Sequence, residues 1–206
     1  MARTRDEALH ATRRQDILAA AARVFKAKGF HLARTEDICA EAGLSAGTLF
    51  RHFPDKRSMI AAIADDEFER LRSEIAQLST KEGILWLTQI TAEELEQLIE
   101  PKGFELGTDS WLELARDGEG RKRLLAVDQT LRQMISRQLE QGMAEGWIRE
   151  SVDSDGTAAI LLALFSGLQL GSEVGLAVNT KATACAIADL FGGLLVSRSS
   201  STNSEP

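Results

Sequence analysis

The stretch Gly29–Met59 constrains the fold more than any other part of the chain, because it carries the start and stop signals of two short helices. Thr35 is a favourable N-cap, and the two acidic residues after it suit the positive end of a helix dipole. Gly43 suits the left-handed conformation that often ends a helix. Ser45 is a second N-cap, and Pro54 closes a helix of about two turns. We therefore predict a helix, a tight glycine turn and a second helix, an order typical of the helix-turn-helix motif.

The second of these helices has two different faces on a helical wheel. The expected core side carries Ala46, Leu49, Phe50 and Phe53. The opposite side presents Thr48 and Arg51, flanked by Gly47 and His52. Arginine can bind guanine bidentately in the major groove, and glycine lets the backbone approach closely. The alternative is an ordinary two-helix hairpin whose polar face is merely solvated.

The start of the next helix is unusually basic. Asp55 can cap it, yet Lys56 and Arg57 lie in its first turn, where a cation opposes the helix dipole at a cost of about 0.3–1 kcal/mol each. A phosphate bound at this helix start would reverse the penalty. We therefore expect this turn to contact a nucleic-acid backbone.

Many positions between Arg13 and Ile60 match one known pattern in register. They are Gly29-Phe30, Thr35 with Asp37-Ile38, Ala42-Gly43-Leu44-Ser45, Gly47-Thr48-Leu49-Phe50, His52-Phe53 and Lys56. Together they resemble the DNA-binding domain of the tetracycline-repressor (TetR) family. The resemblance implies an all-α fold, in which an N-terminal three-helix helix-turn-helix domain precedes a larger helical domain for ligand binding and dimerisation.

The DNA contacts that this interpretation predicts come from the turn and the helix after it. They are Arg34, Thr35, Ser45, Ala46, Gly47, Thr48, Phe50, Arg51, His52 and Lys56. Two positions depart from the family pattern. Ala46 stands where the family often has lysine, and Phe50 stands where tyrosine is common, so two phosphate contacts are expected to be missing.

The charge distribution supports a division into domains. Residues 1–57 hold 11 Lys and Arg against 7 Asp and Glu, whereas the remainder holds 13 against 24, within a net charge of −7. We predict a DNA-binding domain at 1–57, an effector-binding and dimerisation domain at 58–196, and a disordered tail at 197–206. The first twelve residues are expected to be disordered until bound. Their arginines, with Arg13 and Arg14, form either a basic arm for DNA or a solvated tail.

Helical patterns account for the rest of the chain. The predicted helices are 14–28, 56–78, 81–99, 104–116, 120–145, 155–178 and 180–196. Residues 156–172 carry no charge, which is near the lower limit for a membrane span. Glycines recurring every four residues instead favour a buried helix–helix interface in a soluble homodimer. The expected dimer interface contains Gly167, Gly171, Gly175, Ala184, Ile187 and Phe191.

The chemistry of an enzyme is not indicated. All three histidines lie within the first 52 residues, so no metal cluster is expected in the acidic domain. Neither a phosphate-binding loop nor a nucleophile elbow is present in the sequence. Cys39 and Cys185 are interpreted as small core residues rather than a disulfide or metal pair. We expect no cofactor. The first sixteen residues lack the apolar segment of a signal peptide, which favours the cytoplasm.

The function predicted from the sequence is a ligand-responsive transcriptional regulator. The expected protein is a repressor that binds a palindromic DNA operator as a homodimer and is released by a small apolar or aromatic effector. Effector contacts are expected from Trp86, Phe104, Trp111, Met134 and Phe165, although all five suit a plain core equally well. The alternative is a helical interaction module, or an enzyme-like bundle, without specific DNA binding.

Overall fold

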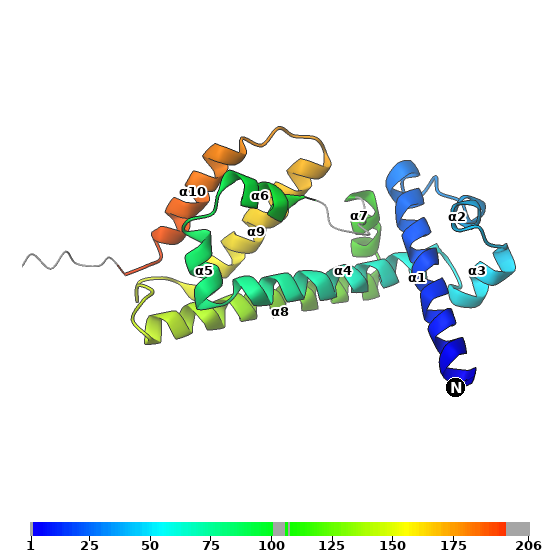
Figure 1. Ribbon diagram of the computed structural model, residues 1–206, viewed down its shortest axis with the longest axis horizontal. Coiled ribbons are helices and arrows are strands. Elements are labelled where there is room, and N and C mark those ends of the chain that lie inside the picture. Colours follow the sequence, from blue (N-terminus) through cyan, green and yellow to red (C-terminus); the bar gives the residue numbers. More distant parts are fainter. Residues whose placement is uncertain (1, 101–105, 107, 197–206) are drawn as a thin grey trace, which may run out of the picture. The chain divides into compact units, whose positions relative to one another are not determined.

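The computed structural model describes residues 2–100, 106 and 108–196. Within them the regular structure consists of ten α-helices, α1 to α10, and an isolated bridge between Ile148 and Leu195 (Figure 1). The all-α prediction is confirmed. The chain divides into two compact units, which are 1–72 with 101–128, and 73–100 with 129–206. The first unit continues past Arg57. The predicted boundary between a DNA-binding and an effector-binding domain at that residue therefore stays a prediction.

The first unit contains α1 (Ala2–Lys28), α2 (Thr35–Ala42), α3 (Ala46–His52), the first part of α4 (Lys56–Leu78), α7 (Thr108–Arg116) and the start of α8 (Gly118–Ala144). Helix α1 packs beside α2 (Figure 1). The core of the unit is formed by Ile17, Leu18, Phe25, Ile38, Leu49, Phe53, Ile60, Ile63, Leu106 and Leu114. Leu49 of α3 and Phe53 at its C-cap thus share one core with residues of α1, α2 and α4.

The second unit contains the end of α4, α5 (Lys81–Leu87), α6 (Ala92–Ile99), the rest of α8, α9 (Ser154–Glu173) and α10 (Thr180–Gly192). Helix α10 packs on α5 and α6, and α6 packs on α9. Fully buried side chains here include Leu95, Leu139, Ile187 and Phe191. The segment that follows α10 in the sequence pairs with the connection between α8 and α9. The N–H of Arg149 donates to Leu194 O at 3.0 Å, and the N–H of Val196 donates to Trp147 O at 3.0 Å.

Several helix limits differ from those predicted. Helix α1 begins at Ala2, so residues 2–12 are not the irregular segment that was expected. The predicted helix 81–99 is two helices, because Thr91 starts a new one by accepting from the N–H of Glu94 at 3.2 Å. Helix α9 ends at Glu173, short of the predicted Val178. The limits of α4 agree with the prediction, whereas Phe104 and 197–206 lie outside the described residues.

Candidate nucleic-acid interface and ligand pocket

The turn between α2 and α3 has the backbone geometry that its glycine and serine imply. Gly43 has φ +63°, and a Cβ there would meet nothing within 4 Å, so the backbone conformation alone explains the glycine. The N–H of Leu44 donates to Cys39 O at 2.9 Å and closes α2. Ser45 then caps α3, since its Oγ accepts from the N–H of Thr48 at 3.3 Å. The predicted helix, turn and helix are confirmed.

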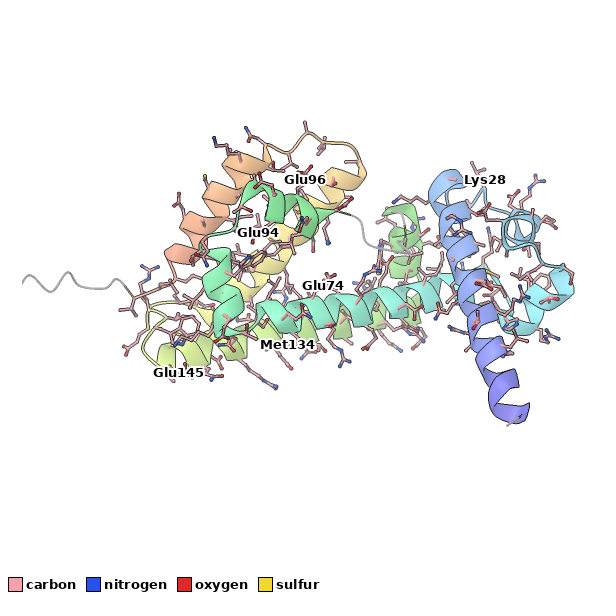
Figure 2. The ribbon with its side chains drawn as sticks, viewed as in Figure 1. Lys28, Glu74, Glu94, Glu96, Met134 and Glu145 are labelled. Carbon is pink, nitrogen blue, oxygen red and sulfur yellow. The ribbon has the colours of Figure 1, made fainter. Side chains whose placement is uncertain are left out.

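The start of α2 differs by one residue from the expectation. Its N-cap is Arg34, with extended backbone, and Thr35 is the first helical residue rather than the cap. The N–H of Arg34 donates to Asp37 Oδ2 at 3.0 Å. Lys28, at the end of α1 (Figure 2), has its Nζ 2.7 Å from Asp37 Oδ1. The hydrogen bond from Lys28, followed by that from Arg34, lowers the pKa of Asp37. One carboxylate thus fastens α2 to α1.

The exposed face of α3 is larger than the helical wheel predicted. Leu49 and Phe53 are buried as expected, but Ala46 is exposed and Phe50 is 51% exposed, so placing these two in the core was wrong. A helix of seven residues on α1 buries only a narrow side, which leaves the remaining directions open. Ser45, Gly47 and Arg51 are exposed as well. The face therefore offers a guanidinium, a hydroxyl, an aromatic ring and bare backbone.

His52 is oriented toward α1 more than the prediction implied. Its ring centroid lies 4.2 Å from that of His10, and its buried Nδ1 has no hydrogen-bond partner among the described residues. Burial, followed by the positive charges of His10, Arg51 and the arginines at 13 and 14, lowers the pKa of His52. A direct DNA contact of His52 stays a prediction.

The ammonium of Lys56 is engaged by the protein itself. Nζ donates to Phe30 O and to Ala33 O, both at 2.7 Å, and lies 4.5 Å from the centroid of the Phe30 ring. The lysine thereby closes the loop between α1 and α2. These two carbonyls are enough to explain why a cation lies in the first turn of α4. The basic start of α4 is therefore no longer an argument for a bound phosphate. Lysine has three donors, so one N–H is left for a further acceptor.

A carboxylate that the sequence did not single out joins α7 to this region. Glu113 is largely buried, and its oxygens lie 3.2 Å from Arg57 Nη2, 3.5 Å from His31 Nε2 and 3.8 Å from Arg116 Nη1. Arg57 is thus held by an ion pair rather than presented freely. No local pattern marks Glu113, because two of its three partners lie more than fifty residues away in the sequence.

The second unit contains an apolar pocket with an empty volume of about 390 Å³, including its open mouth. It is lined from α4, α5, α8, α9 and α10 by Ile75, Leu78, Ser79, Ile84, Leu87, Ile135, Gln138, Leu161, Leu162, Phe165 and Phe191. Of the predicted effector residues, Phe165 lies here. Met134 is on α8 (Figure 2) but does not line this pocket.

The predicted aromatic residues do not converge on one pocket. Trp86 donates from Nε1 to Glu94 Oε1 at 2.9 Å, and Trp111 packs on Phe68 in the first unit at 5.4 Å between ring centroids. Phe104 lies outside the described residues. The lining is instead mainly aliphatic, a property that no spacing in the sequence revealed because its members come from five helices.

The predicted dimer interface is only partly accessible. Ala184, Ile187 and Phe191 are buried in the core of their own protomer, and Gly171 lies against Leu176. These four therefore do not form an open surface. Gly167 is exposed, and Gly175 lies beyond the end of α9 with φ +74°.

A different set of residues forms an exposed stripe along α9. Its members are Ile160, Ala163, Gly167 and Leu170 on the helix and Val174 at its C-cap, all of them exposed at alternating spacings of three and four residues. This spacing places them on one side of a helix. The outward face of α10 is formed by Ala182, Cys185, Ala186, Asp189 and Leu190. Cys185 is therefore a surface residue rather than the core residue expected, whereas Cys39 is buried.

Two kinds of feature are absent from the part of the chain that the structure describes. No helix in it is long and apolar enough to cross a membrane. No group of three or more His, Cys, Asp or Glu side chains within the same residues is arranged to hold a metal ion.

Comparison with known proteins identifies both parts of the chain. Residues 17–63 match the family described as "Bacterial regulatory proteins, tetR family", and 114–186 match the "Tetracyclin repressor-like, C-terminal domain". The HTH-type transcriptional regulator UidR of Escherichia coli K12 is 25% identical over 183 residues, covering 88% of this chain and 92% of UidR. These names are those of regulators rather than of enzymes.

Solved structures agree in fold. A TetR transcriptional regulator from Chloroflexus aurantiacus superposes with a TM-score of 0.68 at 24% identity, covering 90% of this chain and 96% of that one. A putative transcriptional regulator from Saccharomonospora viridis, solved in complex with choline, gives a TM-score of 0.61 at 25% identity, covering 91% and 100%.

Proposed function

Because the chain belongs to the TetR family of bacterial transcriptional regulators, we propose that it is a repressor that binds a palindromic operator as a homodimer and is released by a small apolar effector. The observation that carries the proposal is the exposed face of α3. This helix is capped at Ser45, anchored by Leu49 and Phe53, and free on the side of Gly47 and Arg51. A cytoplasmic location accompanies the proposal.

The predicted DNA contacts differ in how well the geometry supports them. Gly47 accepts a close approach, since a Cβ there would meet nothing within 4 Å, and Arg51 can reach a guanine edge. Ser45, Ala46 and Phe50 are exposed beside them. Lys56 and His52 already contact the protein, so we assign them to positioning the interface first and to DNA second.

Dimerisation is proposed through the α9 stripe and the outward face of α10. A recognition helix as short as α3 contacts only a few base pairs, so two copies are needed for useful specificity. The α9 stripe exposes Ile160, Leu170 and Val174, each 45–66% accessible, around the open backbone of Gly167. An exposed apolar patch of this kind is typical of an interaction surface. The proposed interface thus moves from Ala184, Ile187 and Phe191 to residues that the protomer leaves exposed.

Selection from a pool of random DNA duplexes tests this function. The expected result is enrichment of an inverted repeat whose half-sites lie about one helical turn apart, or a multiple of it. Arg51→Ala should relax the enriched sequence at one position, whereas Arg149→Ala, which removes the same charge from an exposed site in the second unit, should leave it unchanged. Failure of the wild-type protein to enrich any sequence would favour the alternative of a helical interaction module.

The effector is proposed to occupy the apolar pocket of the second unit. The Saccharomonospora viridis protein was solved in complex with choline, which carries a permanent positive charge. The pocket here has no carboxylate in its lining, and its aromatic residues are two phenylalanines, the weakest cation–π partners. We therefore do not propose choline for this chain.

A further inference from the structure

One residue of the pocket lining, Ser79, has a hydroxyl without a hydrogen-bond partner among the described residues. Ser79 Oγ is buried, and among the described residues it makes no hydrogen bond, although its backbone N–H donates to Ile75 O at 2.7 Å. A buried polar group in that state is unfavourable, and native proteins rarely leave one without a hydrogen-bond partner. Ser79 lines the pocket directly behind the last residue of α4.

The other lining residues restrict the kind of ligand that the pocket can bind. None of the eleven lining residues is charged, and Gln138 is the other polar side chain among them. An ion placed in such surroundings would lose its hydration without a counter-charge. The two phenylalanines are outnumbered by leucine and isoleucine, so the lining is mainly aliphatic.

We propose that this pocket binds a neutral, mainly aliphatic molecule whose hydroxyl or carbonyl group forms a hydrogen bond with Ser79 Oγ. The inference rests on the proposed function, because it identifies the chemical class of the effector. The proposed effector is apolar, as predicted from the sequence, but aliphatic rather than aromatic.

Ser79 is connected along the chain to the DNA-binding helices by one continuous helix, α4. Helix α4 begins at Lys56, which holds the loop before α2, and ends at Leu78 beside Ser79. A ligand that bonds Ser79 and packs on Ile75 therefore stabilises one arrangement of the end of α4. Release of DNA requires only that this arrangement differ in operator affinity from the ligand-free one.

The test uses the full-length protein and four defined probes. 1-Octanol and n-octane share a body and differ in the hydroxyl, and their binding is measured by headspace gas chromatography. Octanoate and choline chloride, both charged at pH 8, are measured by calorimetry. We expect 1-octanol to bind saturably, with octanoate at least about tenfold weaker and choline not detected, because both would bury a charge.

The variant Ser79→Ala isolates the hydrogen bond. It should weaken 1-octanol binding by about three- to tenfold and leave n-octane unchanged. Ser79→Thr retains the hydroxyl and should bind 1-octanol better than Ser79→Ala does. Ser73→Ala, at an exposed position of α4, should change the binding of neither ligand.

Three results would overturn the inference. They are failure of 1-octanol to bind, binding of octanoate or choline as tight as that of 1-octanol, and equal effects of Ser79→Ala on both uncharged probes. Operator binding is measured on the same preparations without any probe. If ligand-free protein selects no DNA sequence while the Ser79 results hold, the proposed regulatory function fails and the chemistry of the pocket stands.

Discussion

Replacing Lys56 by methionine separates a structural role of its ammonium from a role in holding DNA. Methionine retains an apolar stem of similar length but removes both hydrogen bonds, to Phe30 O and to Ala33 O, and the cation–π interaction with the Phe30 ring. A hydrogen bond from a charged group contributes about 1.5–3 kcal/mol, and a partly exposed cation–π pair about 0.5–1 kcal/mol. Since the side chain is only half-buried, we expect the free energy of unfolding to fall by about 2–4 kcal/mol.

Urea denaturation measures that decrease, and Arg57→Met is the matched control. Arg57 is the neighbouring cation, but its side chain is 69% exposed and makes one ion pair, with Glu113 at 3.2 Å. Because the Arg57 side chain is mostly exposed and Glu113 keeps His31 and Arg116 as partners, we expect the loss of this part-buried pair to cost about 1 kcal/mol. The two variants should therefore differ clearly in the urea midpoint while having the same net charge.

The salt dependence of operator binding tests the alternative role of Lys56, a contact with DNA phosphate. If the Lys56 ammonium binds a phosphate, removing it makes the slope of log affinity against log salt concentration shallower by about 0.9 per half-site. If Lys56→Met changes that slope and leaves the unfolding free energy within about 0.5 kcal/mol of wild type, which is the normal range for a surface substitution, our structural interpretation is refuted. The ammonium would then serve DNA rather than the loop.

Three further perturbations test other parts of the molecule. Arg51→Ala should weaken specific operator binding by about 1–3 kcal/mol in fluorescence anisotropy, and an equal weakening on random DNA would reduce Arg51 to a phosphate-binding role. Leu170→Lys should give monomers in analytical ultracentrifugation and abolish tight binding to a palindrome, whereas a persistent dimer would place the interface elsewhere. The pKa of His52 is lowered by burial, so protonation favours the unfolded state. Stability should accordingly fall as the pH drops through about 6.5, and urea titrations at pH 7.5 and 5.5 should show a smaller fall for His52→Gln.

Local signals in the sequence predicted the parts of the fold that depend on near neighbours. The αL conformation of Gly43 and the cap at Ser45 each involve residues within five positions, and both were predicted correctly. The limits of α4 were predicted for the same reason. The break between α5 and α6 was missed, although Thr91 and Glu94 form a capping box, because the apolar pattern continues across it.

Contacts between distant residues could not be obtained from the sequence in this way. Lys56 bonds carbonyls 23 and 26 positions earlier, and a pattern of side chains says nothing about which carbonyls a loop leaves open. Ile187 and Phe191 formed an apolar stripe, but whether such a stripe faces its own protomer or a partner depends on α5 and α6. The aromatic residues expected in one pocket were separated for the same reason.

The pairing of the segment behind α10 with the α8–α9 connection has a practical consequence for shortening the chain. The bonds Arg149–Leu194 and Val196–Trp147 tie down the end of the helix that carries Phe191 into the apolar pocket. Deleting residues from Leu194 onward would therefore fray α10 from its C-terminal end and loosen one wall of the pocket. Deleting only the residues after Val196 leaves both bonds in place, so an affinity tag for purification is best attached beyond that residue.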